Sequence, residues 1–362
     1  MKELLIICPY PQNVAPSQRL KFEQYYEAFR EDGWRITVKP FISENFWKII
    51  YKKNYFFKKA FFTIQGYINR LRLLWKIRNY DVVYVHLWAT PFGPPIFERM
   101  IRRRAKRMIY DIDDLVYLRN TKSKAHPIVN FIKGRKKPIY LMQQADHVIT
   151  CTPYLDEFVR QYNSNTTDIS STVDTEKKYI PGNNYSNNKA ITIGWSGSLS
   201  TSKYFYLLKR VFIELIKHHQ FNLLVLGDKN VAIEGLNIQA TDWSEDLEIL
   251  TLSQFDIGIY PLPNEEWIYG KSGLKAIQYM ALGIPTVATA IGANFRVIEN
   301  EVSGFLVKTD EEWIETLSKL IKDVDLRRRI GINARKRVEE LFSVKKNKKT
   351  YLDILNGQLN TN

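Results

Sequence analysis

The sequence is poor in cysteine and lacks long apolar runs. Its 362 residues contain two cysteines, Cys8 and Cys151, each at the end of a short apolar run. Cysteines placed in this way favour buried strand ends over a disulfide framework or a metal site, and a reducing cytoplasm suits them. No apolar run reaches the roughly 18–20 residues that a membrane-spanning helix needs. The opening run is interrupted by Pro9 and Pro11, too early for a signal peptide. We therefore expect a cytoplasmic protein.

Acidic residues are scarce in the first half of the chain. Residues 1–180 hold 31 Lys and Arg but only 17 Asp and Glu, which accounts for +14 of the total net charge of +15. Residues 46–80 contain nine Lys or Arg, eleven aromatic residues and no acidic residue. Aromatic rings beside lysines suit an anionic bilayer surface, so we expect this segment to hold the protein on the inner face of the plasma membrane. The alternative is a basic amphipathic helix pair with its aromatic side chains in the core. Since no recognised nucleic-acid-binding motif is found, we expect no nucleic-acid partner.

Strand-like and helix-like runs alternate along the whole chain. Five strands are expected before about residue 172, and residues 17–33 are expected to form a single helix that ends at Gly33. The Asn- and Gly-rich residues 181–189 are typical of a linker, after which the same alternation starts again. This pattern predicts an α/β fold with two Rossmann-like domains facing across a cleft. The expected domains are residues 1–180 and 181–345, with 346–362 as a helix that crosses back to the first domain.

Two turns in the second half carry the residue types that bind phosphate. The first, GWSGSLSTSK, follows an apolar run and contains Gly197, Ser198 and Lys203. Small residues, exposed amides and a helix start favour an anion there, although a glycine turn with Ser or Thr caps explains it equally well. The second turn precedes the run GLKAIQYMALG and contains Lys271 and Ser272. Two cations and free amides at this helix start indicate a diphosphate site.

The run Ile257–Val307 resembles the nucleotide-binding half of the group 1 retaining glycosyltransferases, which have the GT-B fold. That family has a Glu, seven residues and a second Glu before Ala-Met-Ala-x-Gly-x-Pro. The residues in register here are Gly273, Leu274, Met280, Ala281, Gly283, Pro285, Val287 and Ala288. Similarity continues in GWSGSLST, in VLGD with its Gly227, and in FDIGIYPLP. PYPQNVAPSQR and YDIDDLVY resemble a bacterial polysaccharide-building branch of the family.

The resemblance implies a nucleotide-sugar donor, linked to UDP or GDP, and no other cofactor. The donor-binding residues that we expect are Gly197, Ser198, Lys203, Gly227, Lys271, Ser272, Gly273, Leu274, Lys275 and Gln278. The sequence departs from the family at the two glutamates, which fall at Gly270 and Gln278. The Gln278 amide can bind the ribose, and a nearby acid, Glu265 or Glu266, is a candidate to replace the first glutamate. The family's phosphate-binding Arg/Lys pair falls at Ser198 and Lys203.

Acidic residues follow an expected strand of the first domain. Asp113 and Asp114 stand where many family members have His-Asp, and we interpret them as catalytic candidates that contact the acceptor hydroxyl. His86 is a further, lower-ranked candidate, and Arg19 is expected on the acceptor side. A strand-end carboxylate that caps the next loop is the alternative. Asp111 and Asp113 also form an Asp-x-Asp pattern, but this belongs to the other major glycosyltransferase fold, so we expect no metal.

Together these features predict a hexosyltransferase-like enzyme of class EC 2.4 that acts with retention. Its expected acceptor is a saccharide or a polyprenyl-diphosphate-linked saccharide in the synthesis of bacterial cell-surface polysaccharide. Two alternatives remain open at this point. One is a nucleotide-sugar epimerase of the same fold. The other is a non-catalytic nucleotide-binding paralogue, which the loss of the first glutamate at Gly270 favours.

Overall fold

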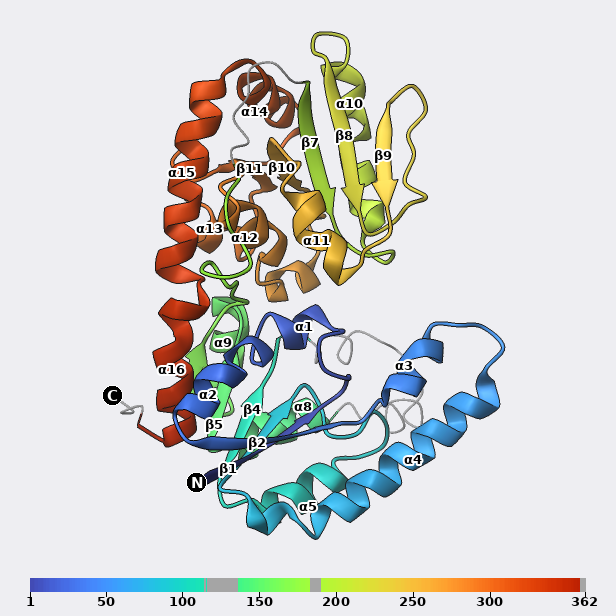
Figure 1. The fold of residues 1–362 in the computed structure, drawn as a ribbon, viewed down its shortest axis with the longest axis vertical. Coiled ribbons are helices and arrows are strands. Elements are labelled where there is room, and N and C mark those ends of the chain that lie inside the picture. The colour runs from blue at the N-terminus through green and yellow to red at the C-terminus, as the bar shows by residue number, and fades with distance from the viewer. Residues whose placement is uncertain (114, 116–135, 183–189, 359–362) are drawn as a thin grey trace. The chain divides into compact units, whose positions relative to one another are not determined.

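The computed structural model describes residues 1–113, 115, 136–182 and 190–358 (Figure 1). The chain forms two compact units, of which the first comprises residues 1–171 with 348–362 and the second residues 172–347. The sequence placed the boundaries at 180/181 and 345/346, and most of its expected linker, residues 183–189, lies outside the described residues. Each unit is a parallel sheet with helices on both faces (Figure 1), so the predicted α/β fold of two Rossmann-like domains is confirmed.

The first unit has six strands among the described residues, in the order β2-β1-β3-β4-β5-β6. The five strands that the sequence predicts are all present, and all neighbouring strands run parallel. Cys8 ends β1 and Cys151 follows β5, and both are buried as predicted. The strands are β1 Lys2–Cys8, β2 Trp34–Pro40, β3 Val82–His86, β4 Met108–Asp111, β5 His147–Thr150 and β6 Thr166–Asp168.

Helices of the first unit connect successive strands. The helices are α1 Pro16–Arg19, α2 Tyr26–Glu31, α3 Glu44–Ile50, α4 Phe56–Leu74, α5 Ile96–Arg104, α8 Lys137–Gln144 and α9 Pro153–Arg160, with part of α16 Val344–Asn356. The single helix expected over residues 17–33 is wrong, because a short 3₁₀ turn at Glu23–Tyr25 separates α1 from α2. The five consecutive residues 18–22 are all buried, whereas a regular surface helix buries only one face.

The second unit also has six strands in its described part, in the order β12-β11-β10-β7-β8-β9. The strands are β7 Ile191–Ser196, β8 Phe221–Leu226, β9 Ile238–Thr241, β10 Ile257–Tyr260, β11 Thr286–Thr289 and β12 Phe305–Val307. Counted from β7, this is the doubly wound order: β8 and β9 are added on one side of β7, and β10, β11 and β12 on the other, so the strand order reverses between β7 and β10 while all strands stay parallel. Ligands of such sheets bind beyond the carboxyl ends of the strands at that switch point.

Two hydrophobic clusters cover the faces of the second sheet. One contains Phe255 and Tyr279, and the other contains Trp195, Phe212 and Leu317. The helices are α10 Lys209–Leu215, α11 Glu245–Leu252, α12 Leu274–Ala281, α13 Asn294–Val297, α14 Asp310–Lys322 and α15 Val324–Leu341. Two 3₁₀ segments, η3 Ser202–Leu208 and η4 Glu266–Gly270, follow the loops after β7 and β10. Both loops with predicted phosphate-binding residues therefore start at the switch point.

Candidate functional site

Paired glycines hold β7 and β10 together beneath the switch point. Gly194 of β7 pairs with Gly258 of β10. A Cβ on Gly194 would lie 2.0 Å from the Phe255 ring, and one on Gly258 would lie 2.5 Å from the Tyr279 ring. The absence of side chains lets both rings pack directly against the sheet. Tyr279 also accepts a hydrogen bond from the backbone amide of Ser196, at 2.7 Å, which fixes the end of β7.

The loop after β7 passes close to the end of β8. Gly227 has φ +122°, and a Cβ there would lie 2.2 Å from the carbonyl oxygen of Gly197. Only glycine fits this position without moving the loop. Ser198 is exposed, and its backbone amide donates to the Thr201 hydroxyl at 2.9 Å. The Ser/Thr turn expected as one alternative is therefore formed, and the exposed Ser198 and Ser200 hydroxyls lie 2.9 Å apart above it.

The loop after β10 leads into the first turn of α12. Gly273 adopts a left-handed conformation, with φ +76°, at the N-cap of this helix. A Cβ there would also lie 2.9 Å from Val297, so the position needs glycine for both reasons. The predicted residues Lys271, Ser272 and Leu274 surround this turn and are each half-buried. The glycine thus sets the direction in which α12 starts and places two polar side chains just before it.

An aromatic contact joins the two loops. The rings of Tyr204 in η3 and Trp267 in η4 lie 5.9 Å apart. Lys203 holds its Nζ 5.3 Å from the centroid of the Tyr204 ring, and Lys271 holds its Nζ 5.2 Å from that of Trp267. Cations favour such positions over aromatic rings. The fold therefore places one lysine from each predicted phosphate-binding loop on a pair of rings in contact.

Gln278 and Lys275 belong to an internal polar cluster. Gln278 is fully buried, and its Nε2 donates to the Tyr179 hydroxyl at 2.6 Å and to Glu248 Oε1 at 3.1 Å. Its Oε1 accepts from Lys275 Nζ at 3.1 Å. Trp243 Nε1 donates to the same Glu248 oxygen at 3.2 Å. Tyr179 and Glu248 were not predicted from the sequence. The only signal for Glu248 is its position four residues after the N-cap Ser244, on the face of α11 that turns inward.

Gly270 stands where the family has its first glutamate, and Glu265 is a nearby acid that could replace it. Gly270 is buried and offers no side chain. Glu265, one of the two candidate replacements, accepts a hydrogen bond from the indole of Trp267 through Oε2. Lys271 lies over the same Trp267 ring. Glu265 thus lies within the same aromatic and cationic cluster, whereas the Gly270 position adds only backbone.

The strand ends of the first unit contain a buried ionic cluster. Asp111 ends β4 and is fully buried, with Oδ1 2.8 Å from Lys21 Nζ and Oδ2 2.9 Å from His86 Nδ1. Burial alone would raise the pKa of Asp111, but Lys21 and His86 outweigh it and lower the pKa to about 2. The same carboxylate raises the pKa of Lys21 against the effect of burial. His86 Nε2 is buried and has no hydrogen-bond partner among the described residues.

The predicted catalytic aspartates lie just beyond this cluster. Asp113 is half-buried two residues after β4 and helps to raise the pKa of Lys21. Asp114 lies outside the described residues. Asp111 is the acid that contacts His86, although the sequence pointed to Asp111 only as part of an Asp-x-Asp pattern. Within the described part of the chain, no three His, Cys, Asp or Glu side chains are grouped as a metal site.

Glu23, close to Arg19 in the chain, supports the loop after β1. Arg19 is buried at the end of α1. The Glu23 carboxylate accepts hydrogen bonds from the backbone amide of Asn13 at 2.9 Å and from the side-chain amide of Gln18 at 3.0 Å. Burial raises the pKa of Glu23, and these two hydrogen bonds oppose the increase. Asn13 has a positive φ of 63°, so the carboxylate holds a strained turn in place.

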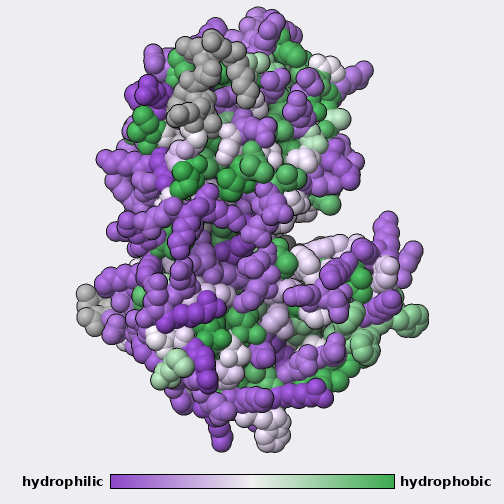
Figure 2. Space-filling model, viewed as in Figure 1, coloured by the Kyte–Doolittle hydropathy of each residue, from purple (hydrophilic) through white to green (hydrophobic). Residues whose placement is uncertain are grey.

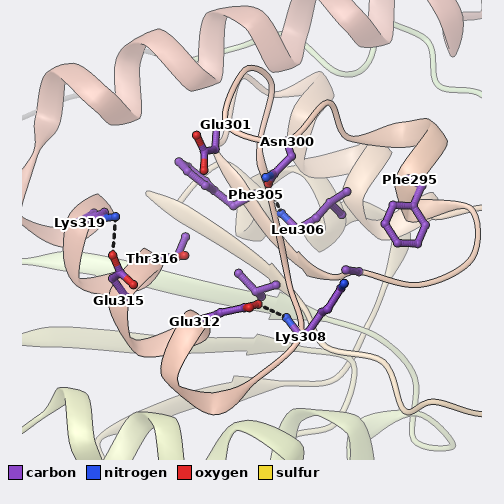
Figure 3. Close-up of a pocket in the computed structure, with 12 residues that line it drawn as sticks. Phe295, Asn300, Glu301, Phe305, Leu306, Lys308, Glu312, Glu315, Thr316 and Lys319 are labelled. Carbon is purple, nitrogen blue, oxygen red and sulfur yellow. Dashed lines mark hydrogen bonds and ion pairs between the residues drawn. The ribbon is translucent and has the colours of Figure 1, made fainter.

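A pocket of about 550 Å³ lies beside β12 in the second unit (Figure 3). The labelled side chains come from α13, β12 and α14 and from the loops next to them. Glu315 pairs with Lys319 at 2.7 Å, and Glu312 accepts from the backbone amide of Lys308 at 2.5 Å. None of the predicted donor-binding residues lines this pocket.

The second unit matches a known family model. Residues 190–323 match the model described as glycosyl transferases group 1, which spans both loops of the switch point. This part of the chain is similar to the group 1 glycosyltransferases. The segment covers Gly197, Lys203, Lys271 and Gln278, so the resemblance stated from the sequence is confirmed for this part of the chain. The match to this model lies entirely within the second unit.

Curated relatives match parts of the chain. The capsular polysaccharide biosynthesis glycosyltransferase CapM of Staphylococcus aureus is 29% identical over 170 residues, which cover 43% of each chain. A trehalose synthase of Pyrococcus horikoshii is 34% identical over 86 residues, or 24% of this chain and 20% of that protein. The chain thus spans about a fifth of the length of the trehalose synthases that it matches.

Solved structures match the chain over its full length. Sucrose-phosphate synthase from Thermosynechococcus elongatus has a TM-score of 0.71 at 16% identity and covers 99% of both chains. Anabaena HepE, solved in complex with UDP and glucose, has a TM-score of 0.71 at 14% identity and covers 99% of this chain and all of its own. At this level of identity the similarity shows the fold alone, which is the GT-B fold that the resemblance implied.

Proposed function

We propose that this chain is a glycosyltransferase that takes its sugar from a UDP- or GDP-linked donor bound at the switch point of the second unit. The observation that carries the proposal is the lysine pair. Lys203 and Lys271 come from different loops, and each lies over one of two aromatic rings in contact. A diphosphate carries the charge that such a pair would bind, and the small residues of the β7 loop leave room for its approach.

The proposed reaction breaks the bond between the anomeric carbon and the diphosphate oxygen. The electron pair leaves with the diphosphate, and Lys203 and Lys271 stabilise the negative charge that develops there. The acceptor hydroxyl forms the new glycosidic bond and releases its proton, for which Asp113 or Asp114 is the proposed acceptor. Retention of configuration is part of the proposal on the strength of the family resemblance. The proposed transfer needs neither a metal nor a further cofactor.

We further propose a saccharide or polyprenyl-diphosphate-linked saccharide as the acceptor, in the synthesis of bacterial cell-surface polysaccharide on the inner face of the membrane. The partial similarity to CapM, whose name places it in capsular polysaccharide biosynthesis, supports this acceptor class. Arg19 and the strand-end acids of the first unit are the proposed acceptor-side residues. No helix in the described residues is long and apolar enough to cross a bilayer.

Thermal unfolding in the presence of UDP, GDP and their sugars tests the donor site. A ligand present at about 100 times its Kd stabilises the protein by ~2.7 kcal/mol. This raises the Tm of a domain of this size by about 5–10 °C. We expect Lys203→Ala and Lys271→Ala each to remove most of this shift. Lys336→Ala is the matched control, because this lysine is exposed on α15 in the same unit. Unchanged shifts in the two site variants would show that the diphosphate binds elsewhere.

One observation favours a non-catalytic nucleotide-binding protein as a second candidate. Gly270 supplies no side chain where the family has its first glutamate, and Gln278 already donates to Tyr179 and Glu248. A donor panel with product detection separates the candidates. Transfer to a lipid-linked acceptor supports the enzyme, and an isomerised free nucleotide sugar would indicate an epimerase instead. Tight donor binding without any product would identify the non-catalytic protein.

A further inference from the structure

Helix α4 carries an exposed apolar stripe along its whole length. The side chains of Phe57, Phe61, Ile64, Ile68, Leu71 and Trp75 are between 42% and 85% exposed. They follow one another at spacings of three and four residues. At about 100° per residue these six positions fall within an arc of about 80° on one side of the helix. Figure 2 shows hydrophobic residues at the surface over this part of the first unit.

The opposite side of α4 is fixed against the first unit. A Cβ on Gly66 would lie 2.7 Å from the Phe41 ring, so the helix backbone approaches that ring closely. Arg70 is buried and donates to the carbonyl oxygens of Ala89, Lys39 and Cys8 at 2.8, 2.8 and 3.1 Å. These contacts set the rotation of α4. The stripe therefore points outward as a consequence of packing, and it is not a core face that has lost its cover.

The exposure of these side chains bears on the two interpretations of the basic aromatic segment. If the aromatic residues of 46–80 served only the core, they would be buried. Phe46 is buried in a cluster with Phe41 and Ile42, which Phe62 and Tyr67 also contact. Phe57, Phe61 and Trp75, in contrast, are exposed by more than 60%. Only part of the segment belongs to the core, and the rest forms a continuous apolar surface. Isolated exposed hydrophobic residues are ordinary, whereas a continuous stripe marks an interaction surface.

The segment that carries the stripe has charge of a single sign. Residues 46–80 contain nine Lys or Arg and no acidic residue. The exposed cations are Lys48, Lys52, Lys53, Lys58, Arg72, Lys76 and Arg78. None of these seven pairs with a carboxylate in the described part of the chain. Helix α5, which packs against α4, adds the exposed Arg99 and Arg103. A partner that binds this face must therefore offer apolar groups to the stripe and anionic groups to the cations beside it.

We propose that α4 lies in the plane of an anionic membrane surface, with the stripe from Phe57 to Trp75 inserted among the lipids. An amphipathic helix with cations beside an apolar face binds at the boundary between headgroups and acyl chains. A second copy of the chain is a poor occupant, because a symmetric contact through α4 would place two all-basic faces against each other. The proposal does not depend on the glycosyl-transfer reaction.

Sedimentation of the full chain with lipid vesicles tests the proposal. The vesicles are phosphatidylcholine alone or mixed with phosphatidylglycerol. We expect binding only to the anionic vesicles, and weakening of that binding as salt rises. The variant Phe57→Ser/Phe61→Ser/Trp75→Ser should lower the partition coefficient by at least about tenfold, because it removes three inserted side chains. Since all three residues are exposed, the Tm should not fall.

The matched control removes exposed apolar residues from the second unit. Leu250→Ser/Ile332→Ser changes two residues that are 65% and 58% exposed, and it should bind vesicles as the unaltered protein does. Equal binding of the triple variant, or binding that ignores lipid charge, would overturn the proposal. A third result would also overturn it. If the chain does not bind vesicles but forms a dimer in analytical ultracentrifugation, and the triple variant does not dimerise, the stripe is a protein interface.

Discussion

Replacing Asp111 with asparagine tests whether the buried ionic cluster stabilises the first unit. Asp111, Lys21 and His86 are fully buried, and the carboxylate contacts both partners at 2.8–2.9 Å. Asp111→Asn keeps the size of the side chain but leaves the Lys21 ammonium buried without its counter-ion. Breaking a buried pair in this way costs about 3–5 kcal/mol. We expect a loss of this size in the free energy of unfolding at pH 7.

The pH dependence of stability gives an independent measure of the same interaction. The pKa of Asp111 falls from its ordinary value of 3.8 to about 2 in the folded chain. A difference of roughly two units corresponds to about 2–3 kcal/mol. Because the folded pKa is the lower one, this stability is present above pH 4 and is lost as the pH falls toward 2. The Asp111→Asn variant should lack this part of the acid-induced loss.

Urea unfolding of the first unit between pH 7 and pH 2 measures both effects. The matched control is Glu31→Gln, which removes an exposed pair with Lys348 at 2.8 Å. An exposed pair contributes at most about 1 kcal/mol. The double variant Lys21→Met/Asp111→Asn should lose less than the sum of the two single variants, because it leaves no unpaired charge. A cost for Asp111→Asn as small as that of Glu31→Gln would refute the reasoning.

Two further predictions concern the second unit. Gly227→Ala places a Cβ 2.2 Å from the Gly197 carbonyl oxygen at φ +122°, so we expect a loss of more than about 2 kcal/mol in urea unfolding together with weaker nucleotide binding. Gly235→Ala, at φ +81° with open space around it, should cost only about 1 kcal/mol, and equal costs would contradict the proposed clash. Gln278→Glu restores the family's residue but puts a second carboxylate beside Glu248, 3.1 Å from the present amide. The new carboxyl at position 278 should have a raised pKa, so the variant should be destabilised more at pH 8 than at pH 5, by about 1–3 kcal/mol. If the loss of stability relative to the unaltered protein does not change with pH, this contact is not formed.

Local sequence patterns were sufficient for much of the fold. The β3, β4 and β7 strands are short, buried apolar runs, and each was predicted from the sequence. The β9 and β12 strands were missed, because both lie at sheet edges and their residues are mostly only half-buried. Edge strands lose the continuous apolar signal that two covered faces produce.

The same limit applies to the candidate site. The two loops with Lys203 and Lys271 could be found from their composition and from the family pattern. Their contact could not, because it depends on the pairing of β7 with β10 and on the meeting of Tyr204 with Trp267. The partners of Gln278 could not be predicted either, because Tyr179 and Glu248 lie in distant parts of the chain.

The sequence by itself determined the alternation of strands and helices and the single sign of charge over residues 46–80. These are local properties, set by the covalent chain and the solubility of each side chain. The tertiary structure decided which side of α4 faces solvent and which acidic side chains are buried. It joined Asp111 to Lys21 and His86 from three separate segments. Burial and charge pairing act through space, so residues far apart in the chain acquire these properties only when the fold brings them together.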